Sequence, residues 1–261
     1  VPVPEDRVTD RSHSARKVAL AGGVPGFEDT RWPALRFTTS DVETMASALS
    51  GFEVIRQVRS EDTTRAAVLD ALNRLSSDLT RTEDTLLVYL STHGTLGRAG
   101  AADVRRFIVT SDTRKDLVEQ TGLGVSEVLA AMGKVRSRRK ALVLALCHSG
   151  QGKSALNDEL TRALAGRKSG FFLAPVEDVS SAMVVLSAAS WGEPAIEDDV
   201  LGGDVYTHYL VEGIQANDLD RDGAVTITEA HEFALERVYY HTKGVQRPSI
   251  EMLMQGTDPI V

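Results

Sequence analysis

Short apolar segments alternate with helical patterns along most of this 261-residue chain, and this alternation constrains the fold most strongly. Strands that alternate with helices form a mostly parallel sheet, because each helix returns the chain to the edge at which the previous strand began. The right-handed crossovers place these helices above and below the sheet. We expect one α/β domain over residues 1–261, with helices on both faces of the sheet. The expected strands are 17–21, 52–58, 84–91, 107–110, 141–146, 183–189 and an edge strand at 248–254. The expected helices are 40–49, 63–79, 125–135, 154–165, 206–215 and 228–240, and residues 95–104 are expected to form a loop.

Two of the expected strands lead to residues with reactive side chains. Segment 141–146 ends at Cys147, the single cysteine of the chain, and segment 84–91 is followed closely by His93. The carboxyl ends of parallel strands meet at one edge of a sheet, where open α/β folds bind their ligands. A thiol and an imidazole brought to that edge can act as a nucleophile and its general base.

A cysteine at the end of an apolar strand is also compatible with a small buried core residue. Glycines favour the reactive interpretation, because Gly94 and Gly150 closely follow the two strand ends, where the backbone can approach a ligand. Backbone N–H groups near Gly94 and Ser149 could stabilise an oxyanion. His148 directly follows the cysteine, so its side chain is expected to point away and to have a structural role.

These two blocks, YLSTHG at 89–94 and CHSG at 147–150, resemble the catalytic signature of caspase-like cysteine peptidases, in particular of bacterial metacaspase-like members. The resemblance extends over most of the chain, although the local signature that true caspases carry around their cysteine is absent. It implies a caspase-type three-layer sandwich and the hydrolysis of peptide bonds. In that mechanism the sulfur of Cys147 attacks the scissile carbonyl, and His93 protonates the leaving amine and then activates water.

The resemblance also implies where a substrate side chain binds. Metacaspase-like enzymes receive Arg or Lys on acidic residues, and one acid usually stands two residues before the cysteine, where this chain has Ala145. Asp41 matches a second acidic position, and Ser91 matches a further pocket position two residues before His93. Asp41 could instead begin and cap a helix. Since one retained carboxylate can still bind a guanidinium bidentately, we expect cleavage after Arg or Lys.

Trp191 and the acidic residues that follow it are further candidates for the wall of the substrate groove. The acids are Glu193, Glu197, Asp198 and Asp199. In the groove they would attract a cationic side chain, and the alternative is a solvated loop.

Residues 218–229, DLDRDGAVTITE, match the loop of an EF-hand calcium site. Acids occupy loop positions 1, 3, 5 and 12, and a glycine occupies position 6. Because grouped carboxylates repel one another without a cation, the pattern predicts Ca²⁺ as a cofactor, against the alternative of a solvated acidic turn. Whether the ion regulates activity or joins two helices is open. The expected ligands are Asp218, Asp220, Asp222, Ala224 through its carbonyl, Thr226 and Glu229.

Charge and composition narrow the choice of partners and location. A net charge of −8 argues against nucleic acid or an anionic membrane as a partner. No apolar run approaches the roughly 20 residues that span a bilayer, and one cysteine does not require an oxidising compartment. We expect a cytoplasmic, bacterial monomer that acts on protein or peptide substrates, although the start at Val1 leaves room for an upstream segment.

The combined prediction is a calcium-binding cysteine endopeptidase. By the resemblance, cleavage within the segment 151–182, which carries Arg162, Arg167 and Lys168, would mature the enzyme. The alternative function is a non-catalytic calcium-binding interaction module on the same fold. A nucleotide-binding role for the glycine-rich segment 22–26 is disfavoured, because it lacks the Lys-Ser/Thr pair of a P-loop.

Overall fold

The computed structural model describes residues 15–79, 81–98, 104–147, 183–190, 193–252 and 261. Its main element is a sheet with the strand order β10-β7-β6-β3-β1-β2, in which all neighbours are parallel except the edge strand β10. The strands are β1 (Lys17–Gly23), β2 (Glu53–Gln57), β3 (Thr85–Arg98), β6 (Arg139–Cys147), β7 (Met183–Ser187) and β10 (Ser249–Met252). The parallel arrangement follows from the helical crossovers that the sequence pattern predicted.

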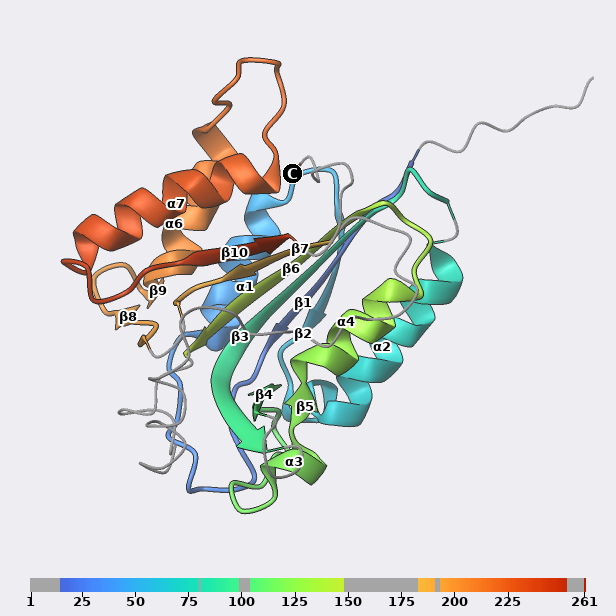
Figure 1. The fold of residues 1–261 in the computed structure, drawn as a ribbon, viewed down its shortest axis with the longest axis vertical. Coiled ribbons are helices and arrows are strands. Elements are labelled where there is room, and N and C mark those ends of the chain that lie inside the picture. Colours follow the sequence, from blue (N-terminus) through green and yellow to red (C-terminus); the bar gives the residue numbers. More distant parts are fainter. Residues whose placement is uncertain (1–14, 80, 99–103, 148–182, 191–192, 253–260) are drawn as a thin grey trace, which may run out of the picture.

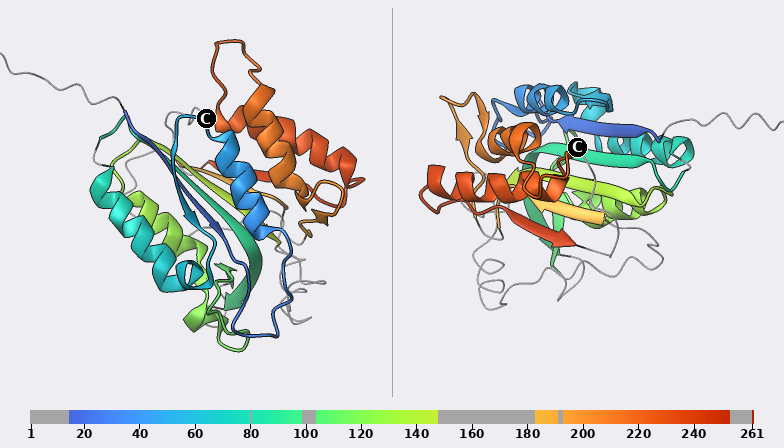
Figure 2. Two further views of the ribbon diagram at one scale, coloured as in Figure 1. Left: turned by 180° about the vertical axis from the view of Figure 1, so that it is seen from behind. Right: turned by 90° about the horizontal axis from the view of Figure 1, so that it is seen from above.

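Helices cover both faces of this sheet and complete a three-layer sandwich (Figure 1). One layer contains α1 (Thr38–Ala48), α6 (Val205–Ala216) and α7 (Ile227–His241). The opposite layer contains α2 (Arg65–Asp78) and α4 (Val125–Gly133), and the view from behind in Figure 2 shows the sheet between the two layers. The prediction of an α/β fold with helices on both faces is therefore confirmed.

Alternating strand residues build two separate cores. Leu87 and Tyr89 of β3 pack among residues of α1, α6 and α7, whereas Leu86 and Val88 pack among residues of α2 and α4. Side chains of a strand point to opposite faces in turn, so a strand covered on both faces must be apolar at nearly every position. This is why the expected strands appear as uninterrupted apolar runs in the sequence.

The expected loop at 95–104 is wrong for its first part. Strand β3 continues to Arg98 and forms an antiparallel ladder with β4 (Val104–Ile108), which in turn pairs with β5 (Leu123–Gly124). A Cβ atom at Gly97 would lie 2.7 Å from the ring of Phe107, so this glycine allows the close approach of the ring. The extension carries the chain away from the main sheet just after His93.

Two other expectations differ from the structure or lie beyond it. Helix α1 begins at Thr38, before the expected start, and its N-cap Phe37 makes no side-chain capping bond.

The remaining helical elements of the described residues are short: a 3₁₀ turn, η1 (Ser60–Thr63), and α3 (Val118–Thr121). The expected helix 154–165 lies outside the described residues. No helix in the described ranges has both the length and the apolar character of a membrane span.

Candidate active site

The two strands that carry the predicted reactive residues are direct neighbours. Strands β3 and β6 pair in parallel over nine positions, and the last pair in this register is His93 with Cys147. Both residues therefore stand at the carboxyl edge of the sheet, on adjacent strands. The backbone of Cys147 belongs to the described structure, whereas its side chain, Ser149 and Trp191 lie outside it.

His93 is almost completely buried, and its ring is held by the segment between β1 and α1. Its Nε2 atom lies 2.7 Å from the carbonyl oxygen of Pro33. The imidazole also stacks with the rings of Phe27 and Trp32, at centroid distances of 5.2 and 6.0 Å. Because a carbonyl oxygen only accepts hydrogen bonds, Nε2 must carry the hydrogen in this contact, and this fixes the ring orientation and tautomer.

The segment that holds the ring is itself anchored. The indole N–H of Trp32 donates to the carbonyl oxygen of Thr113 at 2.9 Å, and the tryptophan is buried. Sequence reasoning did not identify Pro33 or Trp32, because a backbone carbonyl and a packed ring have no motif. Gly94, an expected oxyanion residue, lies in the β3–β4 ladder opposite Ile108.

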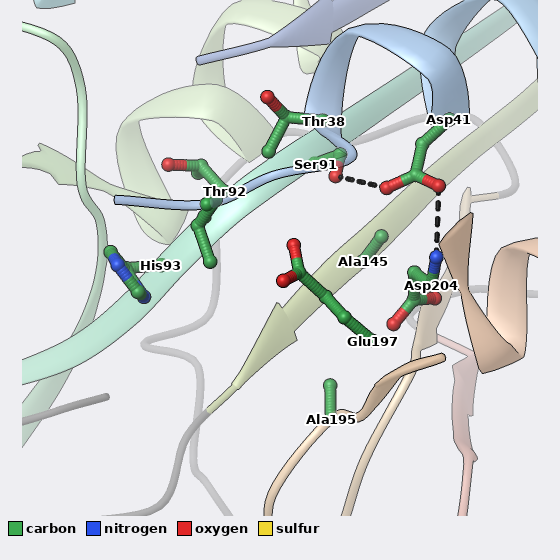
Figure 3. A pocket seen from close by; sticks show the side chains of 10 residues that line it. Thr38, Asp41, Ser91, Thr92, His93, Ala145, Ala195, Glu197 and Asp204 are labelled. Atoms are coloured by element: carbon green, nitrogen blue, oxygen red, sulfur yellow. Dashed lines mark hydrogen bonds between the residues drawn. The ribbon is translucent and has the colours of Figure 1, made fainter. Parts of the chain in front are cut away.

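A pocket with about 290 Å³ of empty space, partly open to solvent, adjoins His93 (Figure 3). Its walls come from α1, the ends of β3 and β6, and a hairpin formed by β8 (Glu197–Asp198) and β9 (Gly203–Asp204). Besides His93, its lining residues include Thr38, Asp41, Ser91, Ala145, Glu197 and Asp204. The structure thus brings together Asp41, Ser91, His93 and Glu197, which the sequence analysis had named, and places Asp204, which it had not named, beside them.

Asp41 lies in the first turn of α1, yet its carboxylate does not cap that helix. One oxygen accepts a hydrogen bond from the hydroxyl of Ser91 at 3.0 Å, and the other accepts from the backbone N–H of Asp204 at 2.9 Å. Burial, reinforced by the nearby negative charge of Asp204, raises the pKa of Asp41 to about 7. Near neutral pH this carboxyl group is therefore only partly ionised.

The carboxylate of Asp204 caps helix α6. Its Oδ1 accepts bonds from the backbone N–H of Thr207 at 2.8 Å and from the Thr207 hydroxyl at 3.0 Å. The same hydroxyl lies 2.8 Å from the phenol oxygen of Tyr89 in the core. An aspartate three residues before a threonine at a helix start is a recognisable capping signal, but nothing local indicates that it faces a pocket.

Of the four acids proposed as a groove wall, Glu197 lines the pocket. Glu193 accepts a bond from the backbone N–H of Arg247 at 2.8 Å, and Asp198 accepts from His241 at 2.9 Å. Asp199 pairs with the exposed guanidinium of Arg36 at 2.6 Å. Three of the acids thus bind other parts of the chain.

The expected calcium loop has the carboxylates of Asp218, Asp220 and Asp222 within 4.8 Å of one another. Backbone N–H groups of the loop support them, including that of Asp222, which donates to Asp218 at 3.2 Å and to Asp220 at 3.1 Å. Gly223 has a φ of 91°, a left-handed conformation that favours glycine. The loop is thus wound around its three aspartates, as the motif predicts.

The other expected ligands of this loop are placed differently. One oxygen of Glu229 accepts bonds from the backbone N–H and hydroxyl of Thr226, at 2.8 and 2.9 Å, in a capping box at the start of α7. The other oxygen accepts from the N–H of Leu219 at 3.1 Å. Glu229 therefore closes the loop onto α7 and lies outside the group of three aspartates, while Ala224 donates its N–H to Asp222 at 2.8 Å.

Comparison with known proteins places the fold. No protein-family model and no curated protein matches the chain. Protein GSU0716 from Geobacter sulfurreducens is 18% identical, with a TM-score of 0.66 over 94% of this chain and 95% of that one. Caspase-1 from Spodoptera frugiperda is 15% identical, with a TM-score of 0.61 over 96% of this chain and 94% of the other. At these identities the similarity concerns the fold alone, and the chain has a caspase-like α/β fold.

Proposed function

We propose that this chain is a cysteine peptidase, with Cys147 as the nucleophile and His93 as the general acid and base. The observation that carries the proposal is the pairing of these two residues at the last position of the parallel register between β3 and β6. Neighbouring strands lie about 4.8 Å apart, so side chains of a paired thiol and imidazole can both reach one substrate carbonyl. The caspase-like fold supports the proposal, and a pocket partly open to solvent adjoins His93 at this edge of the sheet.

The contact with Pro33 supports a specific role for each nitrogen of His93. Nε2 carries the hydrogen bonded to the carbonyl oxygen, so Nδ1 is the nitrogen that exchanges a proton with the reacting groups. The thiolate of Cys147 forms a bond to the scissile carbon, and the carbon–nitrogen bond breaks as the imidazolium gives its proton to the leaving amine. Water then attacks the thioester, loses a proton to the imidazole and releases the acid and the thiol.

The acidic pocket supports a preference for Arg or Lys on the amino side of the cut bond. Asp41, Glu197 and Asp204 place three carboxyl groups around a space next to His93, and a cation offsets the repulsion among them. The segment 151–182, which lies outside the described residues, would then offer its own cleavage sites at Arg162, Arg167 and Lys168.

The loop 218–229 fits a calcium ion in its first half. Asp218, Asp220 and Asp222 would supply hard oxygen ligands, with the carbonyl of Ala224 beside them. A bound Ca²⁺ supplies charge neutralisation at the junction of α6 and α7. Because Thr226 and Glu229 bond to each other, they support the loop through the start of α7.

Digestion of a peptide library by the wild type and by Cys147→Ala, with and without Ca²⁺, tests the proposal. We expect cuts after Arg or Lys that the Cys147→Ala protein does not make, and a loss of kcat/KM of about 100-fold or more in His93→Ala. His208→Ala is the matched control, because His208 pairs with Glu212 on α6 and does not line the pocket. Mass spectrometry of the chain itself detects cuts within 151–182.

The alternative, a non-catalytic calcium-binding module, makes the opposite prediction. A folded wild-type protein that binds Ca²⁺ and leaves every library peptide intact would favour the module. Cuts that fall mainly after Asp or apolar residues would retain the peptidase and refute the basic preference.

A further inference from the structure

We propose that Glu197 is the residue that binds the cationic substrate side chain, and that Asp41 is a positioning residue that braces the pocket wall. This inference rests on the proposed peptidase function and names the specificity-determining residue of the same site. It replaces the expectation that Asp41 receives the cation. It also accounts for the alanine at position 145, where metacaspase-like enzymes usually have an acidic residue.

The bonds of Asp41 favour a bracing role. Each of its two oxygens already accepts a hydrogen bond from the chain, one from Ser91 and one from the N–H of Asp204. These bonds join α1 to β3 and to the β8–β9 hairpin, three elements that meet at the pocket. Because burial raises its pKa to about 7, the group is only partly ionised at neutral pH, and a protonated carboxyl does not form a bidentate ion pair.

Asp204 is committed to its own helix. Its Oδ1 accepts from two groups of Thr207 at the start of α6, and loss of this cap would free the first turn of that helix. Of the three carboxylates at the pocket, Glu197 is the one that points into its open space.

Glu197 reaches into the pocket from the wall that faces the sheet edge. In Figure 3 its carboxylate points into the space beside Thr38, Ser91 and Thr92, away from the Asp41–Asp204 pair. Its side chain is only 13% exposed, so an ion pair formed here is poorly screened by solvent. Ala145 of β6 lines the side of the pocket that the sheet forms. Its short side chain leaves a space that an acidic side chain at this position would fill.

Arg36 at the pocket rim orients Glu197. The backbone N–H of Arg36 donates to Oε1 at 3.2 Å, while its guanidinium lies 3.8 Å from Oε2 and pairs more closely with Asp199, at 2.6 Å. The chain thus already places one guanidinium beside Glu197. Asp199 shares this arginine but is 71% exposed, and it provides a matched control for charge removal.

Binding measurements separate this inference from the proposed chemistry. In the Cys147→Ala protein, calorimetry would follow acetylated tetrapeptide amides that are identical except for a final Arg, citrulline or Asp. Citrulline keeps the shape of arginine and removes its charge. We expect the Arg peptide to bind best, and Glu197→Gln to weaken its binding by about 10- to 100-fold, the loss of one charged hydrogen-bonded pair. Binding of the citrulline peptide should change by less than about threefold.

The controls and outcomes are distinct. Asp199→Asn should leave Arg binding within about threefold of the parent, because an exposed charge contributes little. Glu197→Asp keeps the charge on a shorter side chain and should give an intermediate loss of Arg-peptide binding. An intermediate value would show that the loss in Glu197→Gln reflects the missing charge and not misfolding. Equal Arg binding by Glu197→Gln and its parent would overturn the inference and leave the peptidase proposal intact. Arg binding that depends on Glu197, combined with no Cys147-dependent turnover, would support the inference and refute the peptidase.

Discussion

Replacing Asp41 with asparagine should make the folded chain more stable at pH 8 while changing its stability much less at pH 5. Asp41 is 3% exposed, and burial with the adjacent Asp204 raises its pKa from 3.8 to about 7. Below pH 3.8 the group is protonated in both the folded and the unfolded chain. Between pH 3.8 and about 7 the unfolded chain has released a proton that the folded chain still holds, so the free energy of unfolding falls as the pH rises.

The size of this effect follows from the pKa shift. Since a tenfold change in a proton affinity corresponds to about 1.4 kcal/mol, the rise in the pKa of Asp41 from 3.8 to about 7 gives an upper bound of about 4 kcal/mol by pH 8. About 2.5 kcal/mol of this difference should develop between pH 5 and pH 8. The asparagine side chain carries no charge, so this decrease in the free energy of unfolding does not occur in the Asp41→Asn protein. Its amide oxygen can accept from the N–H of Asp204, and its NH₂ can donate to the hydroxyl of Ser91, so both contacts of Asp41 have a replacement.

Urea unfolding of the wild type and of Asp41→Asn at intervals from pH 5 to pH 8 measures the difference directly. Titration of all other groups cancels in the difference between the two proteins, provided that the substitution leaves them unchanged. We expect the Asp41→Asn protein to gain stability relative to the wild type as the pH rises, with the curve levelling near pH 7. A difference that stays constant across this range, or that shifts in favour of the wild type at high pH, would refute the assignment of a raised pKa to Asp41.

Three further outcomes follow from particular contacts. Gly203→Ala would place a Cβ atom 2.7 Å from Oδ1 of Asp41, so we expect weaker binding of Arg peptides with little change in circular dichroism; unchanged binding would contradict the proposed bracing role. Tyr89→Phe removes the buried 2.8 Å contact with the Thr207 hydroxyl and should lower the free energy of unfolding by about 1–2 kcal/mol, measured in urea; a neutral effect would mean that the contact contributes nothing. Saturating Ca²⁺, at about 100 times its Kd, should stabilise the wild type by about 2.7 kcal/mol in thermal melts. Asp218→Asn should reduce this gain, and an equal shift in both proteins would exclude the loop as the calcium site.

Most strands of the fold could be predicted because the sheet is covered on both faces. Leu86, Leu87, Val88 and Tyr89 are all completely buried, and an uninterrupted apolar run of this length is typical of a strand in a parallel sheet. The extension of β3 escaped prediction because its ladder with β4 alternates small, polar and apolar residues around Gly97, a pattern that also fits a loop. The early start of α1 was missed for a related reason, since Phe37 offers no capping side chain to recognise.

The candidate site was predictable only where local sequence or strand order determined it. The backbone pairing of His93 with Cys147 follows from the parallel packing of two apolar strands that lead to these residues. The contact with Pro33 has no sequence signal, because any residue can present a carbonyl oxygen and only the path of the segment after β1 brings this one to the ring. Glu197 stood among four acids in one stretch, and nothing local distinguished it from the three that do not line the pocket.

The two acidic sites of this chain show why one can be read from sequence and the other cannot. Asp218, Asp220 and Asp222 lie within five consecutive residues, so the turn geometry that gathers them is encoded beside them, in Gly223 and the loop amides. The carboxylates of the pocket come from α1 and the β8–β9 hairpin, and the bond from the N–H of Asp204 to Asp41 spans 163 residues. Their common environment exists only after the sheet and both segments have packed, and the burial that raises the pKa of Asp41 is itself a product of that packing. Because buried carboxylates repel one another, the cationic side chain that we propose as their ligand would offset a cost that the packing itself creates.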